Sequence, residues 1–172
     1  GIGGTYFFQE KYVKAMSNYI LCTEKALKSG NLKHRAALAD IKHNLCQVLI
    51  EKGAINDVLE KIKEEVLDTS LSAELLGVFG KALLKSGNFT QAAIYLERSI
   101  ELLKRGRMFL TLKKEYFLSV LFDLAECYGQ LGLLNKQLNQ LTLIGQKYFP
   151  DEPEVYREIA IFYWYNSDVI SC

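Results

Sequence analysis

The stretch SGNFTQAAIYLERSI, Ser86–Ile100, decides the fold of this chain. Gly87 and Asn88 stand where one run of helix-forming residues ends and another begins, and glycine often ends helices because it adopts a left-handed backbone. On both sides of this turn, apolar residues recur three and four positions apart, which is the spacing of one helix face. The stretch therefore predicts two antiparallel helices joined by a short turn.

The same order of large and small residues recurs around other turns of the chain. Around Gly87 the pattern consists of Leu76, Phe79, Gly80 and Leu83, then Phe89, Ala92, Leu96 and Ser99. Comparable offsets surround Glu10, Gly53, Gly132 and Ser167, with departures from the pattern at Lys42, Gln137 and Ser99. We predict that small residues let paired helices approach closely at Gly3, Ala15, Cys46, Gly80, Ala92, Ala125 and Ala160.

Helical periodicity covers almost the whole chain, and sustained strand-like alternation is missing from the sequence. The two prolines, Pro150 and Pro153, lie in one short segment and leave the remainder free to be helical. Helices are predicted at 1–9, 11–29, 32–52, 55–67, 71–86, 89–105, 108–131, 134–148 and 153–166. The fold class expected is all-α.

Composition excludes some partners and compartments. The 172 residues carry 21 basic and 20 acidic side chains, a formal charge of +1, so no overall field attracts nucleic acid or a membrane. Four widely spaced cysteines without a signal peptide are typical of reduced thiols in the cytosol. Because the longest apolar run, 159–165, is far shorter than a membrane-spanning helix, we expect a soluble, cytoplasmic protein.

The repeated pattern resembles the tetratricopeptide repeat (TPR), whose helix pairs of about 34 residues share such a signature. The resemblance implies a TPR-like solenoid, a right-handed α-α superhelix of antiparallel helix pairs, with about four repeats plus a truncated one. The units implied are 1–30, 31–69, 70–106, 107–149 and the incomplete 150–172. Since the sequence begins with Gly1 and both ends fall inside a repeat, we expect a single repeat domain from a longer protein.

In TPR-like stacks, the first helix of each pair lines a concave groove that accepts a peptide or a partner helix. The resemblance places the main groove positions at His43, Asn44, Gln47, Glu51, Lys81, Lys85, Phe122, Asp123, Glu126, Arg157 and Trp164. Further positions implied are Asp40, Glu74, Gly77, Val78, Ser119, Gln130, Glu154, Glu158, Ile161 and Tyr165. Two of these, Glu74 and Val78, stand where a clamp for a chaperone C-terminus would need basic residues, which disfavours that ligand.

Several groove residues have a second interpretation. Asn44 can hydrogen-bond the backbone of an extended peptide, or it is an ordinary polar surface residue. Phe122 provides an apolar pocket or packs between repeats. Trp164 and Tyr165 either contact a partner or are covered by a following helix.

The sequence contains no pattern typical of an enzyme or a cofactor site. His43 and Cys46 have a spacing that suits zinc, but further ligands are missing and Cys46 occupies a packing position. Glycine-rich phosphate loops and nucleophile elbows are missing from the sequence.

A basic run contains Lys104, Arg105, Arg107, Lys113 and Lys114. We interpret it as a solvated linker and helix start, and expect no nucleic-acid contact.

The function expected is therefore a non-enzymatic domain that binds a peptide or a protein, without cofactor, metal or membrane. Long, degenerate repeats with Gly-Asn turns look similar to the ligand-sensing part of bacterial peptide-pheromone receptors, which implies signalling and transcription regulation. The alternatives are a scaffold or homodimerisation module and a regulatory domain attached to an enzyme.

Overall fold

The computed structural model describes residues 46–66, 73–105 and 114–170, together with Leu21 and Lys28. Every element in these ranges is a helix. The helices are α3 (Ile55–Val66), α4 (Ala73–Lys85), α5 (Phe89–Arg105), α6 (Lys114–Gln130), α7 (Leu134–Leu143), the π-helical turn η2 (Ile144–Tyr148) and α8 (Pro153–Ile170). The prediction of an all-α chain is confirmed for this part of the sequence.

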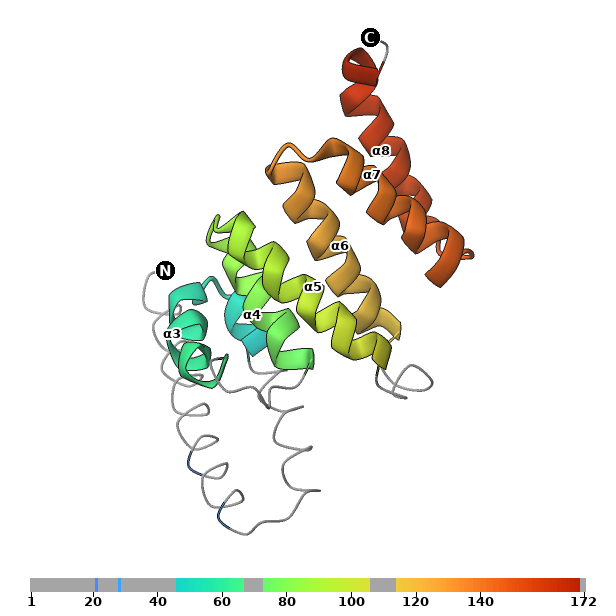
Figure 1. The fold of residues 1–172 in the computed structure, drawn as a ribbon. Coiled ribbons are helices and arrows are strands. Elements are labelled where there is room, and N and C mark those ends of the chain that lie inside the picture. The colour runs from blue at the N-terminus through green and yellow to red at the C-terminus, as the bar shows by residue number, and fades with distance from the viewer. Residues whose placement is uncertain (1–20, 22–27, 29–45, 67–72, 106–113, 171–172) are drawn as a thin grey trace, which may run out of the picture.

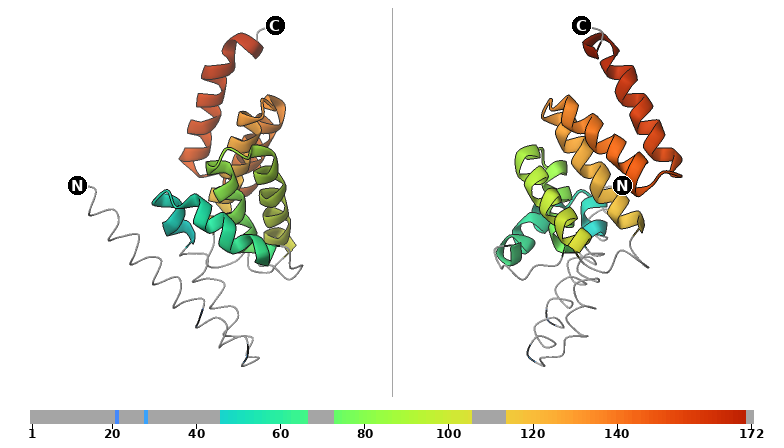
Figure 2. Two further views of the ribbon diagram at one scale, coloured as in Figure 1. Left: turned by 90° about the vertical axis from the view of Figure 1, so that its left-hand side faces the viewer. Right: turned by 45° about the vertical axis from the view of Figure 1, so that its right-hand side comes forward.

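Neighbouring helices pack side by side in chain order (Figure 1). The pair formed by α4 and α5 contacts α3 on one side and α6 on the other, and α7 returns along α6. Figure 2 shows α8 at the end of the stack, with its C-terminal half extending beyond the other helices. Among the described helices, none is both long enough and apolar enough to cross a membrane.

Three predicted turns have the geometry that glycine allows. Gly53, Gly87 and Gly132 have φ angles of 78°, 83° and 69°, in the left-handed region. At Gly87 the backbone N–H donates to the Leu84 carbonyl at 3.0 Å, and the Asn88 N–H donates to the Leu83 carbonyl at 2.9 Å. These bonds satisfy carbonyls that the ending helix leaves without partners.

The closest helix contact joins α4 to α5 at Gly80. A β-carbon built on Gly80 would lie 2.6 Å from Leu96 Cγ, and Leu96 is fully buried. Beside this contact, the rings of Phe79 and Tyr95 meet edge to face at 4.8 Å. The small residues predicted at Cys46, Gly80, Ala92 and Ala125 are all buried.

Buried polar groups connect α4, α5 and α6 near the start of α4. The Ser99 hydroxyl donates to the Ala73 carbonyl at 2.6 Å, and the Tyr116 hydroxyl donates to the Glu74 carbonyl at 3.1 Å. Because the Tyr116 hydroxyl fills the space beside Gly77, no side chain fits there. Glu74, Gly77 and Val78 are buried, so the prediction that they face a groove is wrong.

The last predicted turn, at Ser167, is also wrong. Helix α8 continues through Ser167 to Ile170, because the residues that follow include neither glycine nor proline. The Ser167 hydroxyl donates to the Trp164 carbonyl at 3.3 Å, within the helix. Ala160, predicted as a packing position, is exposed because no described element covers that face of α8.

The end of the predicted helix 134–148 widens into a π-helical turn, η2. The Phe149 N–H donates to the Ile144 carbonyl at 2.8 Å, five residues back, where an α-helix would use four. This turn brings buried Gly145 against Val155 at the start of α8.

Some predictions lie outside the described residues. They include the helices 1–9 and 11–29 apart from Leu21 and Lys28, the helix 32–52 apart from its helical end at 46–51, and the segment 106–113. The turn at Glu10 and the small residues Gly3 and Ala15 also lie there.

Candidate functional site: a cleft between helices α6, α7 and α8

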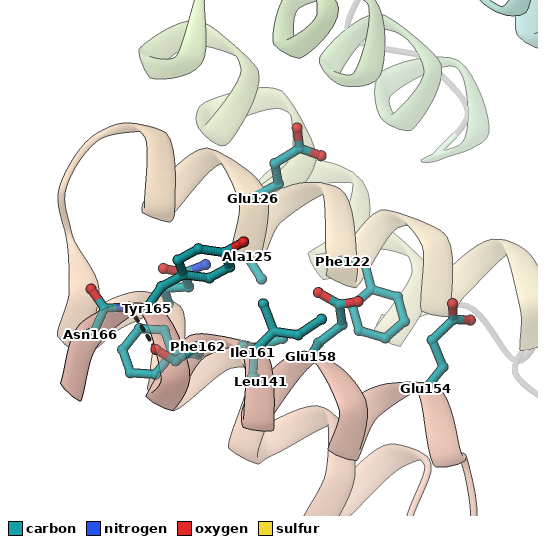
Figure 3. Close-up of a pocket in the computed structure, with 11 residues that line it drawn as sticks. Phe122, Ala125, Glu126, Leu141, Glu154, Glu158, Ile161, Phe162, Tyr165 and Asn166 are labelled. Carbon is teal, nitrogen blue, oxygen red and sulfur yellow. Dashed lines mark hydrogen bonds between the residues drawn. The ribbon is translucent and has the colours of Figure 1, made fainter.

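A cleft of about 450 Å³ opens between α6 and α8, and α7 contributes to its lining. Its lining consists of Phe122, Ala125, Glu126, Gln137, Leu141, Glu154, Glu158, Ile161, Phe162, Tyr165 and Asn166 (Figure 3). The apolar side chains lie between the two helices, and carboxylates stand on both sides. Such a mixture suits a ligand that has both apolar and polar groups.

Helical periodicity explains why these residues meet. On α8, Glu154, Glu158, Ile161 and Tyr165 follow one another at intervals of three or four positions and share one face. On α6, Phe122 and Glu126 are one turn apart. The two faces contribute to the lining of one cleft, and in Figure 3 the Glu126 carboxylate extends from α6 on the side away from α8.

The described residues only partly fill the cleft. Leu141 and Phe162 are buried beneath it, whereas Ile161 is 40% exposed and Tyr165 is 80% exposed. In Figure 3 the Tyr165 side chain extends from α8 toward α6, and the Glu158 side chain extends toward Phe122. An apolar side chain of a ligand would therefore contact Ile161 and the rings of Phe122 and Tyr165.

One basic residue neutralises part of the carboxylate charge. The Arg157 guanidinium lies 2.8 Å from Glu154 Oε1 and 3.2 Å from Glu158 Oε1. Both pairs are exposed enough for water to weaken them. Glu126, across the cleft, has no ion pair with a described residue.

The structure brings together groove residues predicted on two successive first helices. Phe122, Glu126, Glu154, Glu158, Ile161 and Tyr165 all line the cleft. Arg157 stands beside it on α8, and the exposed Trp164 lies outside its lining. Sequence reasoning did not assign Gln137 and Leu141 to the groove, although both line the cleft. The signal at Gln137 was a polar residue in a position where the repeat pattern has a small one.

The remaining groove predictions lie elsewhere. Lys81 and Asp123 form a second contact between α4 and α6, with Lys85 exposed at the end of α4. Gln47 is half-buried and Glu51 is exposed, on the helical segment 46–51, and neither lines the cleft. His43 and Asn44 lie outside the described residues.

Asp123 is a largely buried carboxyl whose charge the neighbouring lysines only partly balance. Its side chain is 13% exposed, and Oδ2 lies 4.0 Å from Lys81 Nζ. Burial raises the pKa of Asp123 to about 6; Lys81 and Lys85 oppose this effect, and Glu126 adds to it. The cost of removing the charge from water therefore exceeds the attraction to the lysines.

Asp123→Asn is expected to raise the free energy of unfolding near pH 8 by roughly 1–3 kcal/mol, because the amide avoids burying a charge. The folded pKa, about 6, exceeds the ordinary value of 3.8. The stabilising contribution of the protonated carboxyl is therefore present below about pH 4 and is lost as the pH rises through about 6. Urea unfolding across this range measures the effect. The exposed Glu115→Gln on the same helix is the control, and an unchanged pH dependence in Asp123→Asn would contradict this explanation.

The predictions about metal binding and nucleic-acid contact concern residues outside the cleft. Among the described residues, no group of three His, Cys, Asp or Glu side chains is placed to hold a metal ion. In the basic run, Lys104 lies over the Tyr148 ring at 5.3 Å and Lys114 over the Phe149 ring at 5.4 Å. These two lysines therefore contact the segment that precedes α8.

Comparison of this chain with protein-family models, with curated proteins and with solved structures gave no match.

Proposed function

We propose that this chain is a non-enzymatic peptide- or protein-binding domain of TPR type, a right-handed superhelix of antiparallel helix pairs. The cleft between α6, α7 and α8 is the binding site in this proposal. The observation that supports it is that groove residues inferred for two successive first helices line a single cleft. In helical repeats, a peptide or helix docks against such an inner face.

The chemistry of the cleft supports a peptide ligand. Phe122, Ile161 and Tyr165 offer apolar surface for side chains, while Glu126 and Asn166 offer polar groups for orientation. The Asn166 amide already donates to the Phe162 carbonyl at 2.8 Å, which fixes its orientation. A peptide would thus meet a partly rigid surface and lose less entropy on binding.

The proposal is tested by selecting displayed random peptides on the immobilised chain and measuring the binding of a selected peptide by calorimetry. Ile161→Ala is expected to weaken binding about tenfold, because it removes apolar contact in the cleft. Ile94→Ala is the matched control: Ile94 is 51% exposed on α5 and lies outside the cleft, whereas Ile161 is 40% exposed. Equal losses in the two variants, or no selected peptide, would contradict the proposal.

A second candidate function is homo-oligomerisation. The observation that favours it is the exposed aromatic surface of α8, where Trp164 and Tyr165 are each 80% exposed. Large exposed aromatic surfaces often mark protein contacts. A dimer that depends on concentration in sedimentation experiments and is lost in Trp164→Ser, without peptide binding, would favour this scaffold function.

We further propose that peptide binding regulates the position of α8, as in the ligand-sensing part of a bacterial transcription regulator. The cleft has α6 on one side and α8 on the other, so a bound peptide would contact both helices. A ligand that binds one spacing of these helices more tightly would shift the population toward it. Fluorescence of Trp164, the only tryptophan of the chain, reports such a change.

A further inference from the structure

The cleft has an unequal charge distribution. Its lining contains three carboxylates, Glu126, Glu154 and Glu158, and no lysine or arginine among the described residues. Arg157 pairs with the two glutamates of α8, but it is outside the lining and its side chain is 63% exposed. The lining therefore holds three carboxylates, of which two pair with one guanidinium outside it, and the cleft carries a net negative charge.

The two lysines of α4, Lys81 and Lys85, do not reverse this charge. Lys81 already faces the Asp123 carboxylate at 4.0 Å, and both lysines of α4 lie outside the cleft lining. An acidic side chain entering the cleft would meet the glutamates, and no described residue of the lining offers it a basic partner. Electrostatic complementarity therefore favours a cationic group and disfavours an anionic one.

We propose that the cleft selects a peptide in which a lysine or an arginine neighbours an apolar side chain. This inference rests on the proposed peptide-binding function and specifies its ligand. The basic head group pairs with the carboxylate of Glu158, and Glu126, which lines the cleft from α6, adds to the negative charge that attracts it. The neighbouring apolar side chain contacts Ile161 and Phe122.

The apolar surface of the cleft also suits the stem of a basic side chain. The methylene groups of lysine and arginine pack on apolar surface while the charged head stays with polar partners. Figure 3 shows Phe122 near Glu158, so the stem can lie against the ring while the head group reaches the carboxylate. The exposed Tyr165 ring offers a further face for a cation.

Peptide selection on two forms of the chain tests the inference. A random peptide library is selected on the wild type and on the double variant Glu126→Gln/Glu158→Gln. The wild type is expected to enrich lysine or arginine beside apolar residues, and the double variant is expected to lose this enrichment. Glu60→Gln/Glu115→Gln is the matched control, because it removes the same charge at exposed sites outside the cleft. Thermal melting of each variant verifies that it is folded.

A double-mutant cycle identifies the contact itself. For one selected peptide, substituting glutamine for its basic residue is expected to weaken binding to the wild type at least about tenfold. The same peptide substitution should have little effect on the double variant, because the carboxylates that recognise the charge are gone. If the loss of affinity from the peptide substitution and the loss from the double variant add independently, the inference is overturned.

The outcomes separate the two proposals. If the wild type selects peptides without basic enrichment, the cationic specificity is wrong and peptide binding stands. If no peptide is selected, peptide binding fails and the specificity fails with it. Equal enrichment on the wild type and on the cleft double variant also overturns the specificity.

Discussion

Gly80→Leu is expected to lower the free energy of unfolding by about 3 kcal/mol or more, because α4 and α5 touch at this position. A β-carbon there would lie 2.6 Å and 2.9 Å from Leu96 Cγ and Cδ2, and 3.2 Å from the Leu96 backbone nitrogen. The Leu96 side chain has no free space to move into, since it is fully buried. The Leu96 backbone can move only if α5 moves. Urea unfolding measures the loss.

Ala160→Leu is the matched control for Gly80→Leu. Both positions hold the small residue of the repeat pattern, but Ala160 is exposed on α8. The substitution there is expected to change stability by less than about 0.5 kcal/mol. A neutral Gly80→Leu would mean that the contact between α4 and α5 is looser than described, and a costly Ala160→Leu would mean that a further element covers α8.

Gly77→Ala is the second substitution with a large expected effect, a loss of about 2 kcal/mol or more. Alanine normally stabilises a helix by about 1 kcal/mol relative to glycine, so the sign of this effect is informative. The added methyl group would collide with the Tyr116 hydroxyl and would lie 3.1 Å from Tyr116 Cζ and from Ser99 Oγ. The hydrogen bond from Tyr116 to the Glu74 carbonyl would have to break.

Removing the colliding atom should partly restore stability. Tyr116→Phe alone is expected to cost about 1–2 kcal/mol, because it leaves a buried carbonyl with fewer partners. The double variant Gly77→Ala/Tyr116→Phe should then be more stable than the sum of the two losses predicts. If urea unfolding shows that the two losses in the free energy of unfolding are additive, the collision with the Tyr116 hydroxyl is not the reason that Gly77 is required.

Within the described residues, local sequence signals predicted the helices and three of the turns correctly. Gly53, Gly87 and Gly132 end helices because their conformation is a property of the residue itself, independent of distant contacts. Close approach at Gly80 followed from the order of large and small residues around it. The resemblance to the repeat family, and not helical spacing alone, implied that Phe122, Glu126 and Ile161 share one groove. Helical spacing explains why the residues contributed by each helix lie on one face.

The errors came from contacts between residues distant in sequence and, at Ser167, from extending the repeat pattern too far. The repeat pattern assigned Gly77 to a groove, but Tyr116, on another helix pair, covers it. No local signal predicts that contact. The turn at Ser167 was inferred by extending the pattern beyond any helix-breaking residue, and α8 simply continues. The contribution of α7 to the cleft, through Gln137 and Leu141, depends on how the helices pack and not on periodicity alone.

The π-helical turn at 144–148 makes the direction of α8 depend on the number of residues before it as well as on their identity. Each residue of an α-helix advances the chain by about 100°, so one deletion that restored α-helical winding would rotate Phe149 by that angle. Phe149 is buried, with its ring centroid 6.1 Å from that of Phe117. A deletion or insertion in this segment would therefore change the direction of α8, which forms one side of the cleft, without altering any residue that lines the cleft.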